Sequence, residues 1–149
     1  MPESLTITIQ NDLSKIEPVS RVIADFVAQR QLSAKVAFDL NLALDELLTN
    51  SILYGYDEGQ DGREIYIRIT HVGDVIELEI EDDGRSYNPL ETPEPNLQAE
   101  LMDRPIGGLG LHLVRKLTDQ VEYQRRDGKN ILTIKKRARP LEETASAPD

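Results

Sequence analysis

The alternation of apolar and polar residues along the chain predicts the strands. Five segments have this period of two, with β-branched residues at many of the apolar positions: residues 5–9, 65–70, 75–80, 121–126 and 131–136. The dipeptide Gly73-Asp74 separates the second segment from the third, and Asp127-Gly128 separates the last two. Both dipeptides favour the tight reversal of a β-hairpin.

A helical spacing of apolar residues appears in three other segments. They run from a cap at Asn11, Asp12 or Ser14 to about Gln31, from a cap at Ser33 to about Gly55, and from Leu111 to Asp119. Residues 87–105 have no period and contain four prolines, which indicates a loop or lid. The order β, α, α, β, β, lid, α, β, β predicts an α+β fold. We expect a two-layer α/β sandwich with a mixed, mostly antiparallel sheet and the helices on one face.

Composition narrows the class of protein. A chain of 149 residues with 39% hydrophobic residues is long enough for one domain with a real core. It has no cysteine and only two histidines, so a thiolate or zinc site is not expected. A formal net charge of -10 argues against direct nucleic-acid binding, and no stretch has the length of a membrane span. We expect a soluble, cytoplasmic domain over residues 1–139 and a disordered acidic tail over residues 140–149.

The helix predicted to end near Gly55 carries an acid and an amide. Glu46 and Asn50 are four residues apart, a spacing that places both side chains on one face of a helix. The rest of the segment is mostly apolar, and burying either group without a partner costs free energy. Two interpretations remain open for the pair taken alone: a functional site, or side chains that simply face solvent or cap a neighbouring element.

Two further motifs border the predicted lid. Asp82-Asp83-Gly84 follows a strand and could hold a ligand's amino group, or could be an ordinary acidic turn. The glycine-rich residues 107–110 precede a helix, where backbone N–H groups favour an anion, although a tight loop is the simpler alternative. Residues 135–137, Lys-Lys-Arg, are interpreted as one face of an edge strand rather than a binding patch.

The three motifs together resemble a known family. E-L-L-T-N on a helix, D-D-G-R-S-Y-N-P after a strand, and R-P-I-G-G-L-G-L-H-L-V after a lid occur in this order. This combination resembles the ATP-binding domain of the GHKL superfamily, which includes gyrase, histidine kinases and MutL-type repair proteins and has the Bergerat fold. Within it the chain is most similar to the small bacterial anti-sigma factors that are serine-protein kinases. The resemblance covers about residues 5–137.

The resemblance implies a role for each matching residue. Asn50 would be the protein ligand of Mg²⁺, and Glu46 would be the catalytic general base. Asp82 would accept a hydrogen bond from the adenine amino group, with Gly84 beside the ring. The phosphates of ATP would contact Gly107, Gly108, Leu109, Gly110 and Leu111. The chain departs from the family at Ser86, where a second glycine is common, and at Tyr54, where a histidine is common.

The function implied by the resemblance is that of an ATP- and Mg²⁺-dependent serine-protein kinase. Such a protein phosphorylates an anti-sigma factor antagonist, binds a sigma factor when the antagonist is modified, and forms a homodimer. Two alternatives stay open at this point. The chain could be a non-catalytic module that uses ATP to shape a protein-binding surface, or a kinase whose partner switch lies outside sigma control.

Overall fold

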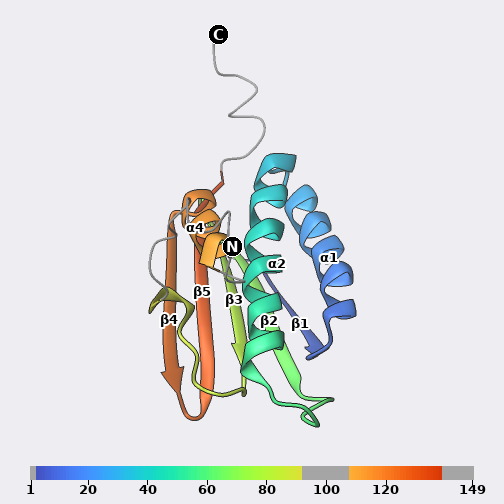
Figure 1. Ribbon diagram of the computed structural model, residues 1–149. Coiled ribbons are helices and arrows are strands. Elements are labelled where there is room, and N and C mark those ends of the chain that lie inside the picture. The colour runs from blue at the N-terminus through green and yellow to red at the C-terminus, as the bar shows by residue number, and fades with distance from the viewer. Residues whose placement is uncertain (1–2, 92–107, 139–149) are drawn as a thin grey trace, which may run out of the picture.

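The computed structural model of the protein describes residues 3–91 and 108–138, and only the backbone of residues 91, 108 and 109 (Figure 1). The predicted tail, Gly107 and most of the predicted lid therefore lie outside the described residues. The elements are β1 Glu3–Gln10, the 3-10 helix η1 Leu13–Lys15, α1 Ile16–Gln29, α2 Ala34–Gly55, β2 Glu64–Val72, β3 Val75–Asp82, the 3-10 helix η2 Pro89–Glu91, α4 Gly108–Leu117, β4 Gln120–Arg126 and β5 Lys129–Arg137.

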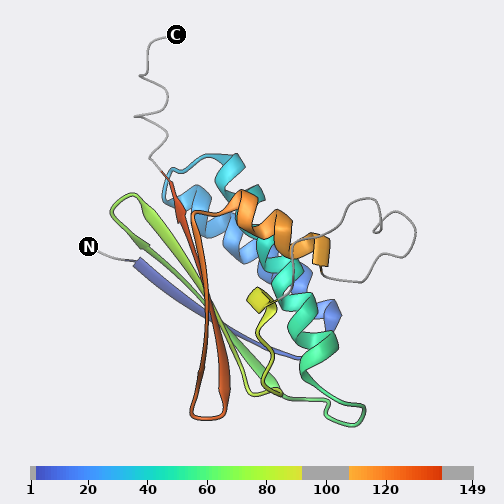
Figure 2. The same ribbon diagram turned by 60° about the vertical axis from the view of Figure 1, so that its left-hand side comes forward.

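The five described strands form one sheet in the order β1-β2-β3-β5-β4. All four ladders are antiparallel. The helices pack on one face of this sheet and leave the other face open (Figure 2). The α+β sandwich predicted from the sequence is confirmed.

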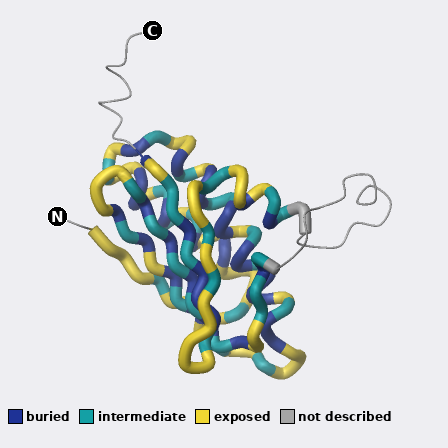
Figure 3. Tube along the Cα trace, turned by 90° about the vertical axis from the view of Figure 1, so that its left-hand side faces the viewer, coloured by how far each residue is buried: buried dark blue, intermediate teal, exposed yellow. Residues whose placement is uncertain are grey.

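The core lies between the sheet and the helices, where the buried stretches of both layers meet (Figure 3). In β2 the isoleucines at 65, 67 and 69 are fully buried, whereas the intervening residues point to the open face. The helix α2 supplies Leu40, Leu44, Leu47 and Leu48, all fully buried. Burial of such side chains contributes roughly 1.5–3 kcal/mol each, so this alternation fixes which face of every strand meets the helices.

Helix α2 is the central helix of its layer, with α1 on one side and α4 on the other (Figure 1). Ser33 caps it, because its hydroxyl accepts a hydrogen bond from the amide of Val36 at 3.4 Å. Near this end the buried carboxylate of Asp39 is 2.7 Å from the ammonium of Lys35 and 3.1 Å from that of Lys136 in β5. Burial alone raises the pKa of Asp39, but its hydrogen bonds with the two lysines outweigh this and keep the pKa below its usual value.

Two details differ from the sequence predictions. Strand β5 lies between β3 and β4, so Lys135-Lys136-Arg137 is not on an edge strand. The hairpin pattern does not say which of its strands joins the existing sheet, and here the second one does. The last helix begins at Gly108 rather than Leu111, which places two of the motif's glycines inside it.

Candidate functional site

The acid and amide of α2 lie on the face that meets α4. The side-chain amide of Asn50 donates to Oε2 of Glu46 at 3.3 Å. Asn50 is only 2% exposed, and its Oδ1 is buried without a hydrogen bond from any described residue. A buried acceptor without a donor is costly, and such atoms call for an explanation. A cation is one partner that would satisfy this oxygen.

The side chain of Glu46 extends from α2 toward the first turn of α4 and is half-buried there. Its burial raises the pKa of the carboxyl group, the hydrogen bond from Asn50 lowers it, and the nearby Asp45 carboxylate raises it, with a net upward shift. A Cβ atom placed on Gly110 would overlap the carboxylate group of Glu46. A glycine is therefore required at this position for α4 to approach Glu46 this closely.

Asp82 is the last residue of β3, and it lies near the C-terminal end of α2, where Gly84 packs against Gly55. It is 3% exposed, and its Oδ1 accepts hydrogen bonds from the amide of Gly84 and from Nδ2 of Asn130, both at 2.9 Å. Burial raises the pKa of Asp82, and hydrogen bonds from Asn130, Gly84 and Ser51 reduce that rise. The bonds from Gly84 and Asn130 both reach Oδ1. Because each carboxylate oxygen can accept more than one hydrogen bond, Oδ2 keeps acceptor capacity for a ligand.

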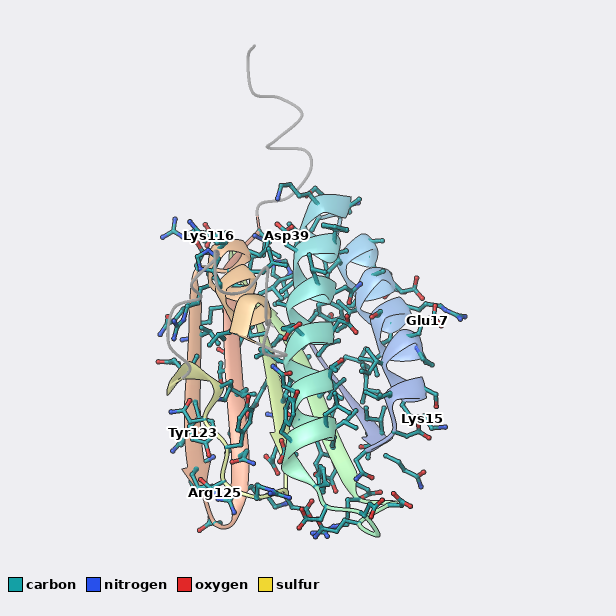
Figure 4. All side chains as sticks on the ribbon, viewed as in Figure 1. Lys15, Glu17, Asp39, Lys116, Tyr123 and Arg125 are labelled. Carbon is teal, nitrogen blue, oxygen red and sulfur yellow. The ribbon has the colours of Figure 1, made fainter. Side chains whose placement is uncertain are left out.

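Asn130 is the residue of this site that the sequence analysis missed. It is 4% exposed, and its Nδ2 also donates to the carbonyl of Arg85 at 2.8 Å. Its Oδ1 accepts from the hydroxyl of Tyr123 at 2.5 Å and from Nη1 of Arg125 at 3.0 Å. Figure 4 labels Tyr123 and Arg125 on β4. The available signal was an amide at an inward-facing position of β5, next to the Asp127-Gly128 turn.

Close backbone packing requires a glycine at position 84. A Cβ atom on this residue would lie 2.5 Å from the carbonyl oxygen of Gly55 and 3.1 Å from Oδ1 of Asp82. The amide of Arg85 donates to the same Gly55 carbonyl at 2.8 Å. The end of α2 and the segment after β3 are therefore in direct backbone contact, which holds Asp82 at a fixed position relative to α2.

The structure brings most of the predicted residues into one region. Glu46, Asn50 and Gly110 meet between α2 and α4, and Gly84 and Asp82 lie where α2 ends. Glu46 and Gly55 are nine positions apart, a helical rise of about 13.5 Å. The side chain of Leu111 is buried in the core, so only its backbone could contact a ligand. The other predicted phosphate contacts are Gly107, which lies outside the described residues, and Gly108 and Leu109, for which only the backbone is described.

The donor set suits magnesium better than zinc. The residues that the structure describes contain no group of three or more His, Cys, Asp or Glu side chains arranged to hold a metal. Mg²⁺ commonly takes only one or two protein oxygens and completes its shell with water and substrate phosphates. The buried Oδ1 of Asn50, beside the carboxylate of Glu46, matches that arrangement.

Comparisons of the sequence with known proteins identify a matching family model and several relatives. The family model described as "Histidine kinase-like ATPase domain" matches residues 9–136. Serine/threonine-protein kinase BtrW of Bordetella bronchiseptica is 34% identical over 108 residues, which cover 72% of this chain and 75% of the relative. The anti-sigma F factor of Bacillus velezensis is 30% identical over 110 residues, 73% of this chain and 75% of the relative.

The fold is also similar to that of solved structures. The crystal structure of the RsbU and RsbW domains of a Mycobacterium tuberculosis protein matches 93% of this chain with a TM-score of 0.67 at 17% sequence identity. This chain covers 33% of that longer one. At this level of identity the match supports the fold. None of the helices in the described part of the chain is long and apolar enough to cross a membrane.

Proposed function

Because the chain belongs to the histidine kinase-like ATPase domain family, in the group that contains serine-protein kinases and anti-sigma factors, we propose that it is an ATP- and Mg²⁺-dependent serine-protein kinase of the anti-sigma type. The observation that carries the proposal is the junction of α2 and α4. There, the buried Oδ1 of Asn50 has no hydrogen bond from any described residue, and its side-chain amide contacts the Glu46 carboxylate, which is packed against Gly110.

In this proposal each end of the site binds one end of ATP. Asp82 accepts a hydrogen bond from the adenine amino group, and Asn130 and the amide of Gly84 hold its carboxylate in place. Asn50 holds Mg²⁺, which when bound neutralises phosphate charge during transfer. The backbone at the start of α4 offers N–H groups to the phosphates.

Glu46 acts on the phosphoacceptor. Its carboxylate accepts the proton of a serine hydroxyl while the serine oxygen bonds to the γ-phosphorus and the bond to the β-phosphate oxygen breaks, releasing ADP. The raised pKa of Glu46 makes the carboxylate a stronger base than an ordinary glutamate. In this proposal the phosphoacceptor is an anti-sigma factor antagonist. When the antagonist is modified, the kinase binds a sigma factor, and the kinase acts as a homodimer.

The test is phosphoryl transfer from radiolabelled ATP to candidate antagonist proteins. Glu46→Gln should lower transfer by roughly 10²- to 10⁴-fold, the usual contribution of a general base. Its ATP affinity should stay within a few-fold of the parent. Glu122→Gln is a matched control, because it makes the same substitution at an exposed position of β4 and should leave transfer unchanged.

Two results would redirect the assignment. Transfer at the parental rate by Glu46→Gln would show that Glu46 is not the base. A parent that binds ATP but phosphorylates no antagonist would favour the non-catalytic binding module or a kinase with a target outside sigma control.

A further inference from the structure

Two tyrosines meet between the two ends of the candidate site. Tyr54 is on α2, one turn after Asn50, and Tyr87 lies in the segment that follows β3. Their ring centroids are 6.1 Å apart with an interplanar angle of 44°. Tilted pairs at this separation are favourable for aromatic rings, so the contact joins α2 to the segment after β3.

The tyrosine pair is connected to both ends of the candidate site, the one at Asp82 and the one at Glu46 and Asn50. The amide of Tyr87 donates to Oδ1 of Asn130 at 3.4 Å, and Nδ2 of Asn130 donates to Asp82. On the other side, Tyr54 follows Glu46 and Asn50 along α2 at successive spacings of four residues, so the three side chains share one face of the helix. Burial raises the pKa of Tyr87, with further increases from Tyr54 and from the Glu46 carboxylate. The two rings thus stand beside the path from Asp82 to Glu46.

Their hydroxyl groups differ from those of the other tyrosines. The chain has five tyrosines, and three of them donate to a side-chain oxygen of Asp83, Glu64 or Asn130: Tyr56, Tyr66 and Tyr123. Tyr54 and Tyr87 form no such bond with any residue that the structure describes, and neither hydroxyl is among the buried unpaired atoms. A half-buried tyrosine usually finds a partner for its hydroxyl. Both tyrosines are half-buried, and none of the described residues forms a hydrogen bond with their hydroxyl groups.

An adenine nucleotide has a fixed order of parts. If its amino group is at Asp82 and its terminal phosphates are near Asn50, the ribose must lie between them. A phenol hydroxyl both donates and accepts, which suits a sugar hydroxyl, and the ring edge packs against the sugar carbons. Resting on the ATP binding proposed above, we propose that Tyr54 and Tyr87 form the ribose subsite of this protein and recognise the sugar hydroxyl groups.

The experiment compares ATP with its 2′-deoxy and 3′-deoxy analogues by calorimetry, on the full chain with Mg²⁺. The parent should bind at least one analogue more weakly than ATP, by about 2- to 12-fold, the value of one neutral hydrogen bond. Tyr54→Phe or Tyr87→Phe, which keeps the ring, should weaken ATP by a similar factor and abolish the preference for ATP over that analogue. Tyr66→Phe, on the open face of the sheet, is the matched control and should retain the preference.

The outcomes separate the two proposals. If the parent binds ATP but both phenylalanine variants bind ATP and the analogues as the parent does, the ribose subsite is wrong and the proposed function stands. If a variant loses ATP affinity but keeps the full preference for ATP over the analogue, the tyrosine supports the site without reading the sugar, which also contradicts the subsite. If the parent binds no ATP, both proposals fail.

Discussion

Gly110→Ala would place one methyl group where the Glu46 carboxylate now lies. The substitution adds no charge and removes no group, so it tests the contact between α4 and α2 alone. The added carbon overlaps the carboxylate at the end of a flexible side chain rather than backbone atoms. We expect Glu46 to rotate away and lose its 3.3 Å hydrogen bond from Asn50.

The stability change should be small because two effects oppose each other. Alanine is favoured over glycine inside a helix by about 1 kcal/mol, and Gly110 lies within α4. Overpacking a fitted contact costs roughly 1–3 kcal/mol, at the low end where a side chain can move. The net change in the free energy of unfolding should therefore stay within about 1 kcal/mol. The rate of phosphoryl transfer should fall much further, by about 10²-fold or more, because a displaced base cannot meet the serine hydroxyl.

The assay is a double-mutant cycle. Transfer rates and unfolding free energies are measured for the parent, Gly110→Ala, Glu46→Ala and the double variant. Because both single changes remove the same positioned carboxylate, their effects on the rate should be far from additive. Gly110→Ala should slow transfer strongly in the parent and little in the Glu46→Ala background. Equal slowing in both backgrounds, or parental transfer by Gly110→Ala, would refute the reasoning.

Three other changes test separate parts of the molecule. Asp82→Asn should weaken ATP binding by at least about 1.5 kcal/mol, the lower value for a hydrogen bond to a charged group; calorimetry with ATP and GTP checks this, and equal affinity of the parent for both would contradict it. Asn50→Ala should make nucleotide binding insensitive to Mg²⁺ with the fold intact, and a magnesium titration that still shows dependence would contradict the metal role. Burial, followed by the charge of Arg30, lowers the pKa of His71 in the folded state. As the pH falls below about 6.5, the unfolded state therefore binds a proton at His71 more readily than the folded state does. The unfolding free energy should therefore decrease from pH 7 toward pH 5, and His71→Gln should flatten this dependence in denaturant titrations; an unchanged slope would exclude His71 as the cause.

The hydrophobic pattern predicted the layers of the fold because burial acts on each side chain separately. Alternation in β2 and β3 specifies an inner and an outer face, and the observed register keeps Ile67 opposite Ile80 on the inner one. The same pattern does not specify neighbours between hairpins. It could not show that β5 joins β3, because alternation gives each strand of the last hairpin an inner face without specifying which strand pairs with β3.

The candidate site was predictable where a residue's chemistry is unusual for its position. Glu46 and Asn50 stand out in an apolar helix, and the structure joins them by a hydrogen bond. Asn130 escaped notice because its importance comes from partners distant in sequence, such as Asp82, 48 positions away. The start of α4 was also misplaced, since glycine normally disfavours a helix interior and the reason for Gly110 is a side chain of another element.

Helix α2 is fixed to the rest of the fold near both of its ends, by the ion pairs of Asp39 and by the backbone contact at Gly55. The number of residues between these two points therefore sets the position and orientation of Glu46 relative to both. One inserted residue between Asp39 and Glu46 would turn everything after it by about 100° and shift it by about 1.5 Å. Either the backbone contact at Gly55 or the packing of Glu46 against Gly110 would then be lost. This stretch of the chain should accept substitutions at outward positions such as Leu53, which is 45% exposed, but neither insertions nor deletions.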